Sequence, residues 1–244
     1  MTRIAAGPLL CGALAALSCG LGAADAGAAE RRGRPVARSA SPGKVVAAEI
    51  AFARLAQSKG QWTAFRETAA EDAVMFVPQL VKARDWLKRQ KNPARAVSWR
   101  PHQVWLSCDG SLAVSYGAWQ GEAGSHGYFT TVWERQQDGG YKWVMDQGDA
   151  LNEPLEDPEM IGSSIAACAG APAKAPAEAV SAGARAGTSK DRTLAWSVQL
   201  DPQCGRTVTI GILRGSGEME AVLNKRVAPP AQGPGGPAPA CVAA

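Results

Sequence analysis

The period of hydrophobic and polar positions changes along the chain, from helix-like near the N-terminus to strand-like in the middle. Over residues 44–59, apolar side chains return every three or four positions, which predicts an amphipathic helix that Gly60 ends. The same spacing predicts helices over residues 61–68 and 83–90, with a short strand over 73–77 between them. This part of the chain is therefore expected to be mainly helical.

From residue 98 onward the hydrophobic period is two, as in half-buried strands. Strands are predicted over residues 98–107, 112–121, 127–137 and 141–148. Asp109-Gly110 and Asp138-Gly139-Gly140 separate two of the pairs, and Asp-Gly sequences favour tight hairpins. Helices followed by a meander of long antiparallel strands predict an α+β fold.

Neither face of the predicted sheet is plainly polar. In the third strand Tyr128 and Val132 share one face, while Phe129 and Trp133 share the other. A sheet with one solvated face would alternate cleanly between apolar and polar side chains. Both faces are therefore expected to be covered, one by the helices and the other by a subunit partner or the C-terminal segment.

The rest of the chain completes six predicted regions. Three further strands, over residues 193–200, 206–213 and 219–223, indicate a small C-terminal β segment. The regions are a signal peptide (1–29), a basic linker (30–43), the main domain (44–152), a loop and Ala/Gly/Pro-rich linker (153–191), the β segment (192–227) and a disordered tail (228–244).

The N-terminus has the pattern of a secretory signal. Arg3 precedes an apolar run over residues 4–17, and small residues around 24–28 offer cleavage sites of the Ala-x-Ala type. The run is too short to span a bilayer, and the residues before Cys19 match a lipoprotein signal poorly. The mature protein is expected to be periplasmic or secreted, and not an integral membrane protein.

Export places the remaining cysteines in an oxidising compartment. They are Cys108, Cys168, Cys204 and Cys241. Four cysteines allow three pairings, and Cys108 with Cys168 is favoured because the first lies at a hairpin and the second just after the main domain. No Cys-x-x-Cys pair occurs and the chain has only two histidines, so no metal site is predicted.

Composition argues against several classes of function. The chain of 244 residues carries 26 Lys and Arg against 22 Asp and Glu, and a net charge of +4 gives no reason to expect a nucleic-acid partner. No Gly-x-Ser-x-Gly, P-loop or dinucleotide-binding motif occurs, so hydrolase and nucleotide chemistry are not expected. No cofactor is predicted.

Four segments carry a resemblance to the nuclear transport factor 2-like superfamily. They are EIAF at 49–52, EDAVMF at 71–76, GYFTTVW at 127–133 and YKWVMD at 141–146. Over residues 44–150 the chain resembles the SnoaL-like polyketide cyclases, steroid delta-isomerases and scytalone dehydratases, and it looks closest to exported bacterial members. The resemblance implies helices packed on a strongly curved, cone-like antiparallel sheet around an apolar pocket. The superfamily contains enzymes, binding modules and assembly domains, so the fold does not determine the function.

The enzymes of this superfamily use an inward-facing Asp or His as a base and a Tyr or Asp as an oxyanion donor. Asp146, His126 and Tyr128 lie in the corresponding elements and are the catalytic candidates, although no motif match supports such a role. Asp146 shares its predicted strand face with Lys142, so a surface ion pair is an equal alternative. For His126 the alternative is an exposed loop, and for Tyr128 it is the core.

Seven of the eight tryptophans fall in the predicted main domain. Most are expected in the core, since an indole buries a large area and needs one acceptor. Trp119 and Trp133, together with Trp99 and Tyr128, are the candidates for an aromatic ligand pocket.

Three functions remain open from the sequence. The first is a non-catalytic module, dimeric through its sheet, that binds a small apolar or aromatic ligand. The second is a cofactor-free isomerase, cyclase or dehydratase in which Asp146 or His126 moves a proton beside Tyr128. The third is a dimerisation or assembly domain. A titratable group inside a closed cavity would discriminate among them.

Overall fold

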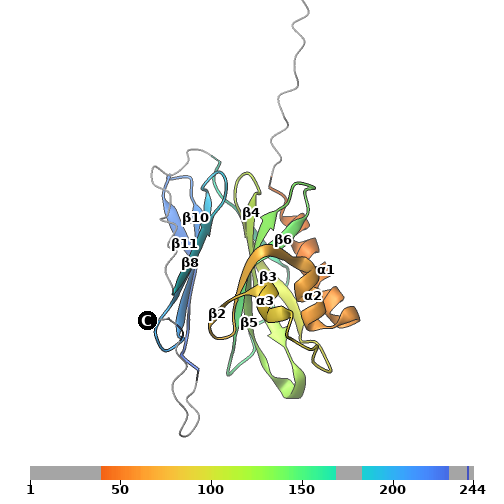
Figure 1. The fold of residues 1–244 in the computed structure, drawn as a ribbon. Coiled ribbons are helices and arrows are strands. Elements are labelled where there is room, and N and C mark those ends of the chain that lie inside the picture. The colour runs from red at the N-terminus through yellow and green to blue at the C-terminus, as the bar shows by residue number, and fades with distance from the viewer. Residues whose placement is uncertain (1–39, 169–182, 231–240, 242–244) are drawn as a thin grey trace, which may run out of the picture. The chain divides into compact units, whose positions relative to one another are not determined.

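The structure, a computed structural model, describes residues 40–168, 183–230 and 241 (Figure 1). The predicted signal peptide, and residues 30–39, 169–182, 231–240 and 242–244 of the predicted linkers and tail, lie outside this description.

In the part of the chain that the structure describes, three α-helices precede most of the strands. They are α1 (Pro42–Lys59), α2 (Gln61–Thr68) and α3 (Ala83–Leu87). Pro42 occupies the first turn of α1, where its missing N–H costs nothing, and Gly60 ends the helix at a φ of 98°. The buried face of α1 has the expected helical spacing, with Val45, Glu49 and Phe52 in successive turns. α3 is shorter than predicted, because the chain after Leu87 continues in hydrogen-bonded turns.

The larger sheet has seven strands in the order β2-β1-β6-β5-β4-β3-β7. They are β1 (Ala69–Phe76), β2 (Leu80–Lys82), β3 (Ser98–Leu106), β4 (Leu112–Gln120), β5 (His126–Arg135), β6 (Tyr141–Ala150) and β7 (Gly162–Ile165). β3 to β6 form the antiparallel meander that was predicted. The sheet as a whole is mixed, because β1 pairs with β6 and β7 pairs with β3 in parallel. Neither pair is joined by a hairpin, and long connections permit parallel pairing.

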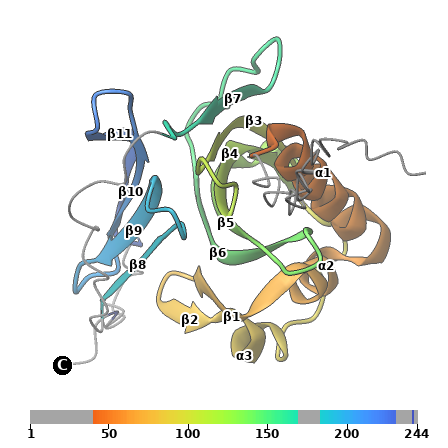
Figure 2. The same ribbon diagram turned by 90° about the horizontal axis from the view of Figure 1, so that it is seen from above.

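One face of this sheet packs against the helices. Figure 2 shows β3 to β6 curling around α1 and α2. Phe52, Phe65, Trp133 and Trp143 belong to the buried cluster between the helices and the sheet. The predicted α+β fold, with helices on a strongly curved, cone-like sheet, is confirmed by this arrangement.

The second sheet has four antiparallel strands in the order β11-β10-β9-β8. They are β8 (Ala184–Thr188), β9 (Leu194–Leu200), β10 (Arg206–Leu213) and β11 (Met219–Val227). The last three match the predicted strands, whereas β8, like β7, lies in the stretch expected to be loop and linker. Neither strand had a recognisable pattern, because β7 is short and β8 is built largely from small residues.

The four-stranded sheet covers the other face of the larger sheet. Val114, Val132 and Met145 share one buried cluster with Val198 and Ile210 of the C-terminal segment. Both faces are therefore covered, as the alternation predicted. The cover on the second face is the C-terminal segment and not a subunit partner, so the face through which a dimer was expected is already occupied.

Within the described residues, two disulfides join distant segments. Cys108 is bonded to Cys168, the favoured pairing, with 5.1 Å between their Cα atoms. Cys204 is bonded to Cys241, with 4.9 Å between their Cα atoms. The first bridge fastens the β3–β4 turn to the segment that leads toward the second sheet.

Candidate functional site

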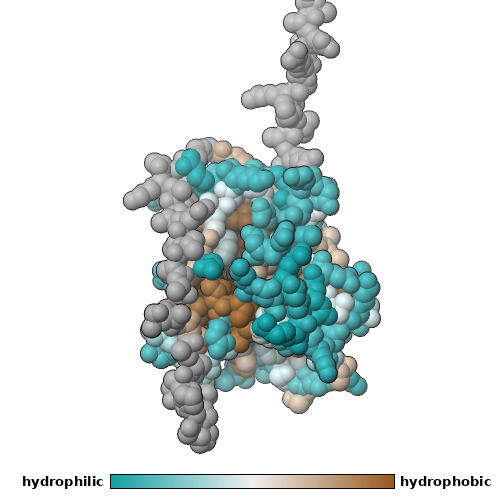
Figure 3. All heavy atoms as spheres, in the orientation of Figure 1, coloured by the Kyte–Doolittle hydropathy of each residue, from teal (hydrophilic) through white to brown (hydrophobic). Residues whose placement is uncertain are grey.

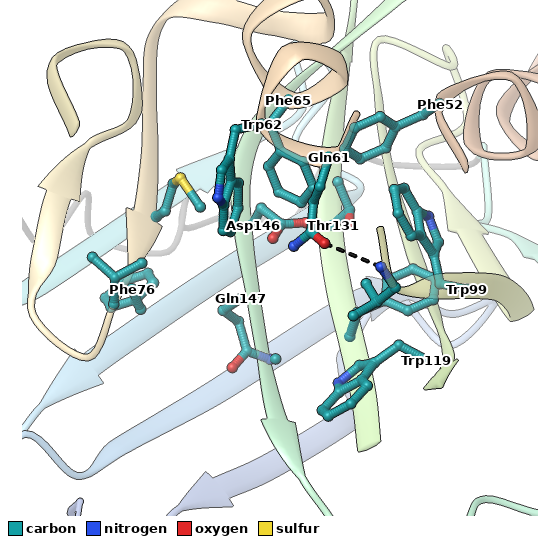
Figure 4. A pocket seen from close by; sticks show the side chains of 15 residues that line it. Phe52, Gln61, Trp62, Phe65, Phe76, Trp99, Trp119, Thr131, Asp146 and Gln147 are labelled. Carbon is teal, nitrogen blue, oxygen red and sulfur yellow. Dashed lines mark hydrogen bonds between the residues drawn. The ribbon is translucent and has the colours of Figure 1, made fainter. Parts of the chain in front are cut away.

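A pocket of about 280 Å³ opens between the helices and the concave face of the larger sheet (Figure 4). Its wall is mainly apolar and rich in aromatic rings. The lining residues are Phe52, Gln61, Trp62, Phe65, Met75, Phe76, Val77, Val97, Trp99, Trp119, Phe129, Thr131, Asp146, Gln147 and Gly148. Gln61 is engaged in holding the wall, since its side-chain oxygen accepts a hydrogen bond from the backbone N–H of Val97.

Among the described residues, Asp146 carries the one carboxyl group that lines this pocket. It reaches the pocket because the β5–β6 register shifts between Val132 and Trp133, a β-bulge that changes the alternation along β6. Trp143 therefore packs on the helix side and Met145 on the side of the second sheet. The predicted alternative, a surface pair of Asp146 with Lys142, is wrong: the bulge separates the two side chains onto different faces, and they form no ion pair among the described residues.

The surroundings of Asp146 favour its protonated form. Burial raises its pKa from the ordinary 3.8 to about 7, the nearby Glu49 carboxyl adds to the increase, and the Thr131 hydroxyl and the Arg206 charge oppose it. Thr131 Oγ1 donates a hydrogen bond of 2.7 Å to Asp146 Oδ2. The other carboxyl oxygen has no hydrogen bond to the described residues, so it can serve a ligand. At neutral pH this group can donate or accept a proton.

A second buried carboxyl, Glu49 of α1, lies behind the pocket wall and has no exposed surface. Its oxygens accept hydrogen bonds from the Trp99 indole at 2.8 Å, from the Trp133 indole at 3.1 Å and from the Ser115 hydroxyl. Burial raises its pKa, and these three bonds act in the opposite direction. Because its acceptor positions are used internally, Glu49 holds the aromatic wall in place and is not free to meet a ligand.

Two of the predicted ligand-binding tryptophans line the pocket. Trp99 and Trp119 both contribute to its wall, and Trp119 is held by a 3.1 Å hydrogen bond from its indole to the carbonyl of Tyr128. Trp133, the third, is not a lining residue: it is 1% exposed and packs in the core, where its indole is bonded to Glu49. The structure therefore brings Trp99, Trp119 and Asp146 together.

Tyr128 lies outside the pocket. Alternate residues of β5 face opposite sides, so Phe129 and Thr131 face the pocket while Tyr128 faces the second sheet. There its ring lies 5.8 Å from Lys225 Nζ, and its buried hydroxyl has no hydrogen-bond partner in the described part of the chain. Burial, with the Asp149 carboxylate second, raises its pKa to about 12. The structure therefore places Tyr128 outside the cavity that Asp146 lines.

His126 also lies away from the pocket. It is the first residue of β5, and its Nδ1 is 2.8 Å from the carbonyl oxygen of Gly124 in the preceding turn. The imidazole is half-buried at the start of the strand, with its Nε2 buried and without a hydrogen-bond partner in the described part of the chain, so it is not the exposed loop histidine of the alternative. Of the three catalytic candidates, only Asp146 lines the cavity.

The sequence reasoning missed Glu49, Thr131, Gln147 and Arg206. A signal existed for Glu49, because it occupies the apolar face of the first helix between Val45 and Phe52, and a carboxyl at such a position must be buried or paired. For the others no local pattern was available. Their roles depend on which strands become neighbours.

Other kinds of site are not indicated in the described regions. No group of three or more His, Cys, Asp or Glu residues is placed there to hold a metal ion. No helix within residues 40–168 and 183–230 has the length and apolar character to cross a membrane.

No protein-family model and no curated protein matches the sequence. Among solved structures, the chain is similar to a protein provisionally described as a ketosteroid isomerase from Parabacteroides distasonis, with 17% identity, a TM-score of 0.38, and coverage of 48% of this chain and 97% of that one. It is also similar to the CaMKII hub of S. rosetta (16% identity, TM-score 0.36, 46% and 98% covered). A third similar structure is ActVI-ORFA from Streptomyces coelicolor, with 16% identity, a TM-score of 0.31, and coverage of 44% of this chain and 95% of that one.

Proposed function

We propose that this protein binds a small apolar or aromatic ligand with one polar group, and that the polar group meets Asp146. The observation that carries the proposal is the composition of the pocket: an aromatic wall with a single carboxyl. Pockets for small molecules combine a mainly apolar lining with a few polar groups that orient the ligand. A volume of about 280 Å³ limits the ligand to a small molecule.

Matched probes test this proposal on the oxidised protein. β-Naphthol and naphthalene have the same two-ring frame, but only the first carries a hydroxyl group. Binding is measured by quenching of tryptophan fluorescence and by the rise in melting temperature. We expect both to bind, with β-naphthol about tenfold tighter, because its hydroxyl group forms a hydrogen bond with the Asp146 carboxyl group.

The Trp119→Phe variant should weaken binding of both probes, since Trp119 lines the pocket. Trp86→Phe is the matched control: Trp86 is a partly buried tryptophan that packs on Trp62 from α3 and is not a lining residue. Absence of binding by either probe to the wild-type protein, or equal losses in the two variants, would contradict the proposal.

A second function, cofactor-free proton transfer, is favoured by one observation. Asp146 lines an apolar pocket and has a pKa of about 7, which suits a general base or acid at neutral pH. The test uses β-tetralone, a two-ring ketone, and follows exchange of its α-protons with deuterium by NMR. We expect wild-type protein to accelerate the exchange and Asp146→Asn to abolish the acceleration. Exchange at the same rate in both proteins would assign Asp146 to binding alone.

Export and self-association are further parts of the proposal. The two disulfides support a periplasmic or secreted location, because such bonds persist in oxidising compartments. A homodimer would have to use a surface other than the face covered by the second sheet. Sedimentation of the mature protein tests this, and a monomer at high concentration would remove both the dimer and the assembly function.

A further inference from the structure

Arg206, the first residue of β10, is a buried cation at the boundary between the two sheets. It is 4% exposed. Burying a charge is costly unless it is paired or fully hydrogen-bonded, so the partners of such a side chain are informative. None of the ion pairs found among the described residues involves Arg206.

The contacts of Arg206 are with the back of the pocket. Its Nε donates a 3.1 Å hydrogen bond to Oε1 of Gln147, and a terminal nitrogen donates another to the carbonyl oxygen of Gly148. Its guanidinium carbon lies 5.7 Å from the centre of the Phe76 ring. Gln147, Gly148 and Phe76 all line the pocket. One side chain of the second sheet therefore supports three lining residues of the first.

The hydrogen bond from Arg206 also determines how the Gln147 amide points. Arg206 has only donors, so the amide oxygen of Gln147 must face it. The amide nitrogen is then directed to Thr130 Oγ1, at 3.1 Å. Hydrogen bonds thereby hold both the oxygen and the nitrogen of the Gln147 amide, in a side chain that is 2% exposed. Gln147 directly follows Asp146 on β6, so the same contact fixes the strand that carries the pocket carboxyl.

We propose that Arg206 is a positioning residue of the pocket. Through this residue the four-stranded sheet holds lining residues of the pocket in place. This inference rests on the proposed function for its binding consequence. The Arg206 charge also favours the ionised form of Asp146, and this effect on the Asp146 pKa can be measured without a ligand.

The charged and titratable groups around Asp146 come from several elements. Glu49 of α1 raises the Asp146 pKa, and Arg206 of β10 lowers it. Arg206 is itself influenced by Tyr128 of β5 and by Asp149 of β6. Arg206 is therefore the cation in this group, and its neutralisation should shift the Asp146 titration upward.

The first measurement is the titration of the Asp146 carboxyl by ¹³C NMR, without ligand, with Asp146→Asn to assign the signal. We expect Arg206→Gln to raise the pKa of Asp146, because the Arg206 charge is one of the causes that lower it. Arg206→Lys should leave it close to the wild-type value, since the charge remains. Arg214→Gln is the matched control, because Arg214 follows the same strand, has a side chain that is 40% exposed and pairs with Glu220.

The second measurement is binding of β-naphthol to the same variants. Arg206→Lys should bind it about tenfold more weakly, because a shorter side chain with one nitrogen cannot hold Gln147 and Gly148 together. Arg214→Gln should bind it normally. If the Asp146 pKa and the affinity for β-naphthol in Arg206→Gln are the same as in Arg214→Gln, the inference is overturned.

Two outcomes separate this inference from the proposed function. If wild-type protein binds no probe, the proposed function fails, and the carboxyl titration still decides the role of Arg206. If Arg206→Gln does not unfold cooperatively in urea, Arg206→Met, which keeps the aliphatic stem against Phe76, takes its place. Loss of folding in both, with Arg206→Lys unaltered in binding, would show a purely structural residue and overturn the inference.

Discussion

The indole N–H of Trp99 on β3 donates a hydrogen bond to Oε1 of Glu49 on α1, with 2.8 Å between the two atoms. The second oxygen of Glu49 receives the indole of Trp133 and the hydroxyl of Ser115. Three strands are thus tied to one helical carboxyl inside an otherwise apolar cluster. A polar group in such a place stabilises the fold only while all its partners remain bonded.

Replacement of Glu49 should therefore be costly. We expect Glu49→Ala to reduce the free energy of unfolding by about 4 kcal/mol, because it removes the acceptor of three hydrogen bonds and leaves a cavity in the buried cluster. Glu49→Gln should cost about 1–2 kcal/mol, since one acceptor oxygen remains. Urea unfolding measures both. Equal losses in the two variants would mean that side-chain volume, and not hydrogen bonding, is what this site requires.

The raised pKa of Asp146 predicts a pH dependence of stability. Between its ordinary pKa of 3.8 and about 7, the folded protein keeps the proton that the unfolded chain has released. The folded state then binds more protons, so stability falls as pH rises through this window. Asp146→Asn should remove the contribution of Asp146 to the slope of unfolding free energy against pH. The contribution of Glu49, whose pKa is also raised, should remain. Urea unfolding at several pH values checks it, and an unchanged slope in Asp146→Asn would contradict the assignment.

Gly127 sets the position of Trp119. A Cβ at Gly127 would collide with the carbonyl oxygen of Asp149 and would lie 2.5 Å from Cζ2 of the Trp119 ring. We expect Gly127→Ala to destabilise the protein by about 1–3 kcal/mol and to weaken β-naphthol binding, because Trp119 must move in the pocket wall. Gly43→Ala is the control, since a methyl group there meets nothing within 4 Å. Normal binding by Gly127→Ala would show that Trp119 does not shape the site.

The Cys108–Cys168 disulfide should stabilise the arrangement of the two sheets. Its 60-residue separation predicts a loss of about 4 kcal/mol on removal in the chain-entropy description. Beside it, the Cys108 N–H donates to Thr193 Oγ1 and the Asp109 N–H to Asp191 Oδ2, so the turn keeps local contacts with the second sheet. We therefore expect the Cys108→Ser/Cys168→Ser protein to fold with reduced stability. Urea unfolding compares it with wild type, and an unchanged midpoint would argue against the bridge.

The sequence by itself predicted the order of the elements. Helical spacing in 44–59 and 61–68, strand alternation in 98–148, and the Asp-Gly turns are local signals, and the structure has helices, strands and turns at these places. The apolar residues on both faces of the strands also predicted that a second layer must cover the sheet, because exposed apolar faces are unfavourable. Local periodicity carries this information since it depends only on neighbours along the chain.

The pocket was less accessible from sequence. Trp99, Trp119 and Asp146 were identified as candidates, but so were Trp133, Tyr128 and His126, which the structure places elsewhere. A single register shift between β5 and β6 reversed the face of Asp146 relative to Lys142, and strand alternation alone could not show it.

Local patterning thus determined the helices, the meander and the need for cover on both sides of the sheet. Only the tertiary structure decided that the C-terminal strands supply that cover, that Glu49 binds two indoles, and that Arg206 supports Gln147 and Gly148. These contacts join residues that are about 50 or more positions apart, so they arise from which strands become neighbours and in what register. A pattern of hydrophobic positions does not specify which strands pair or in what register, because many pairings bury the same apolar surface.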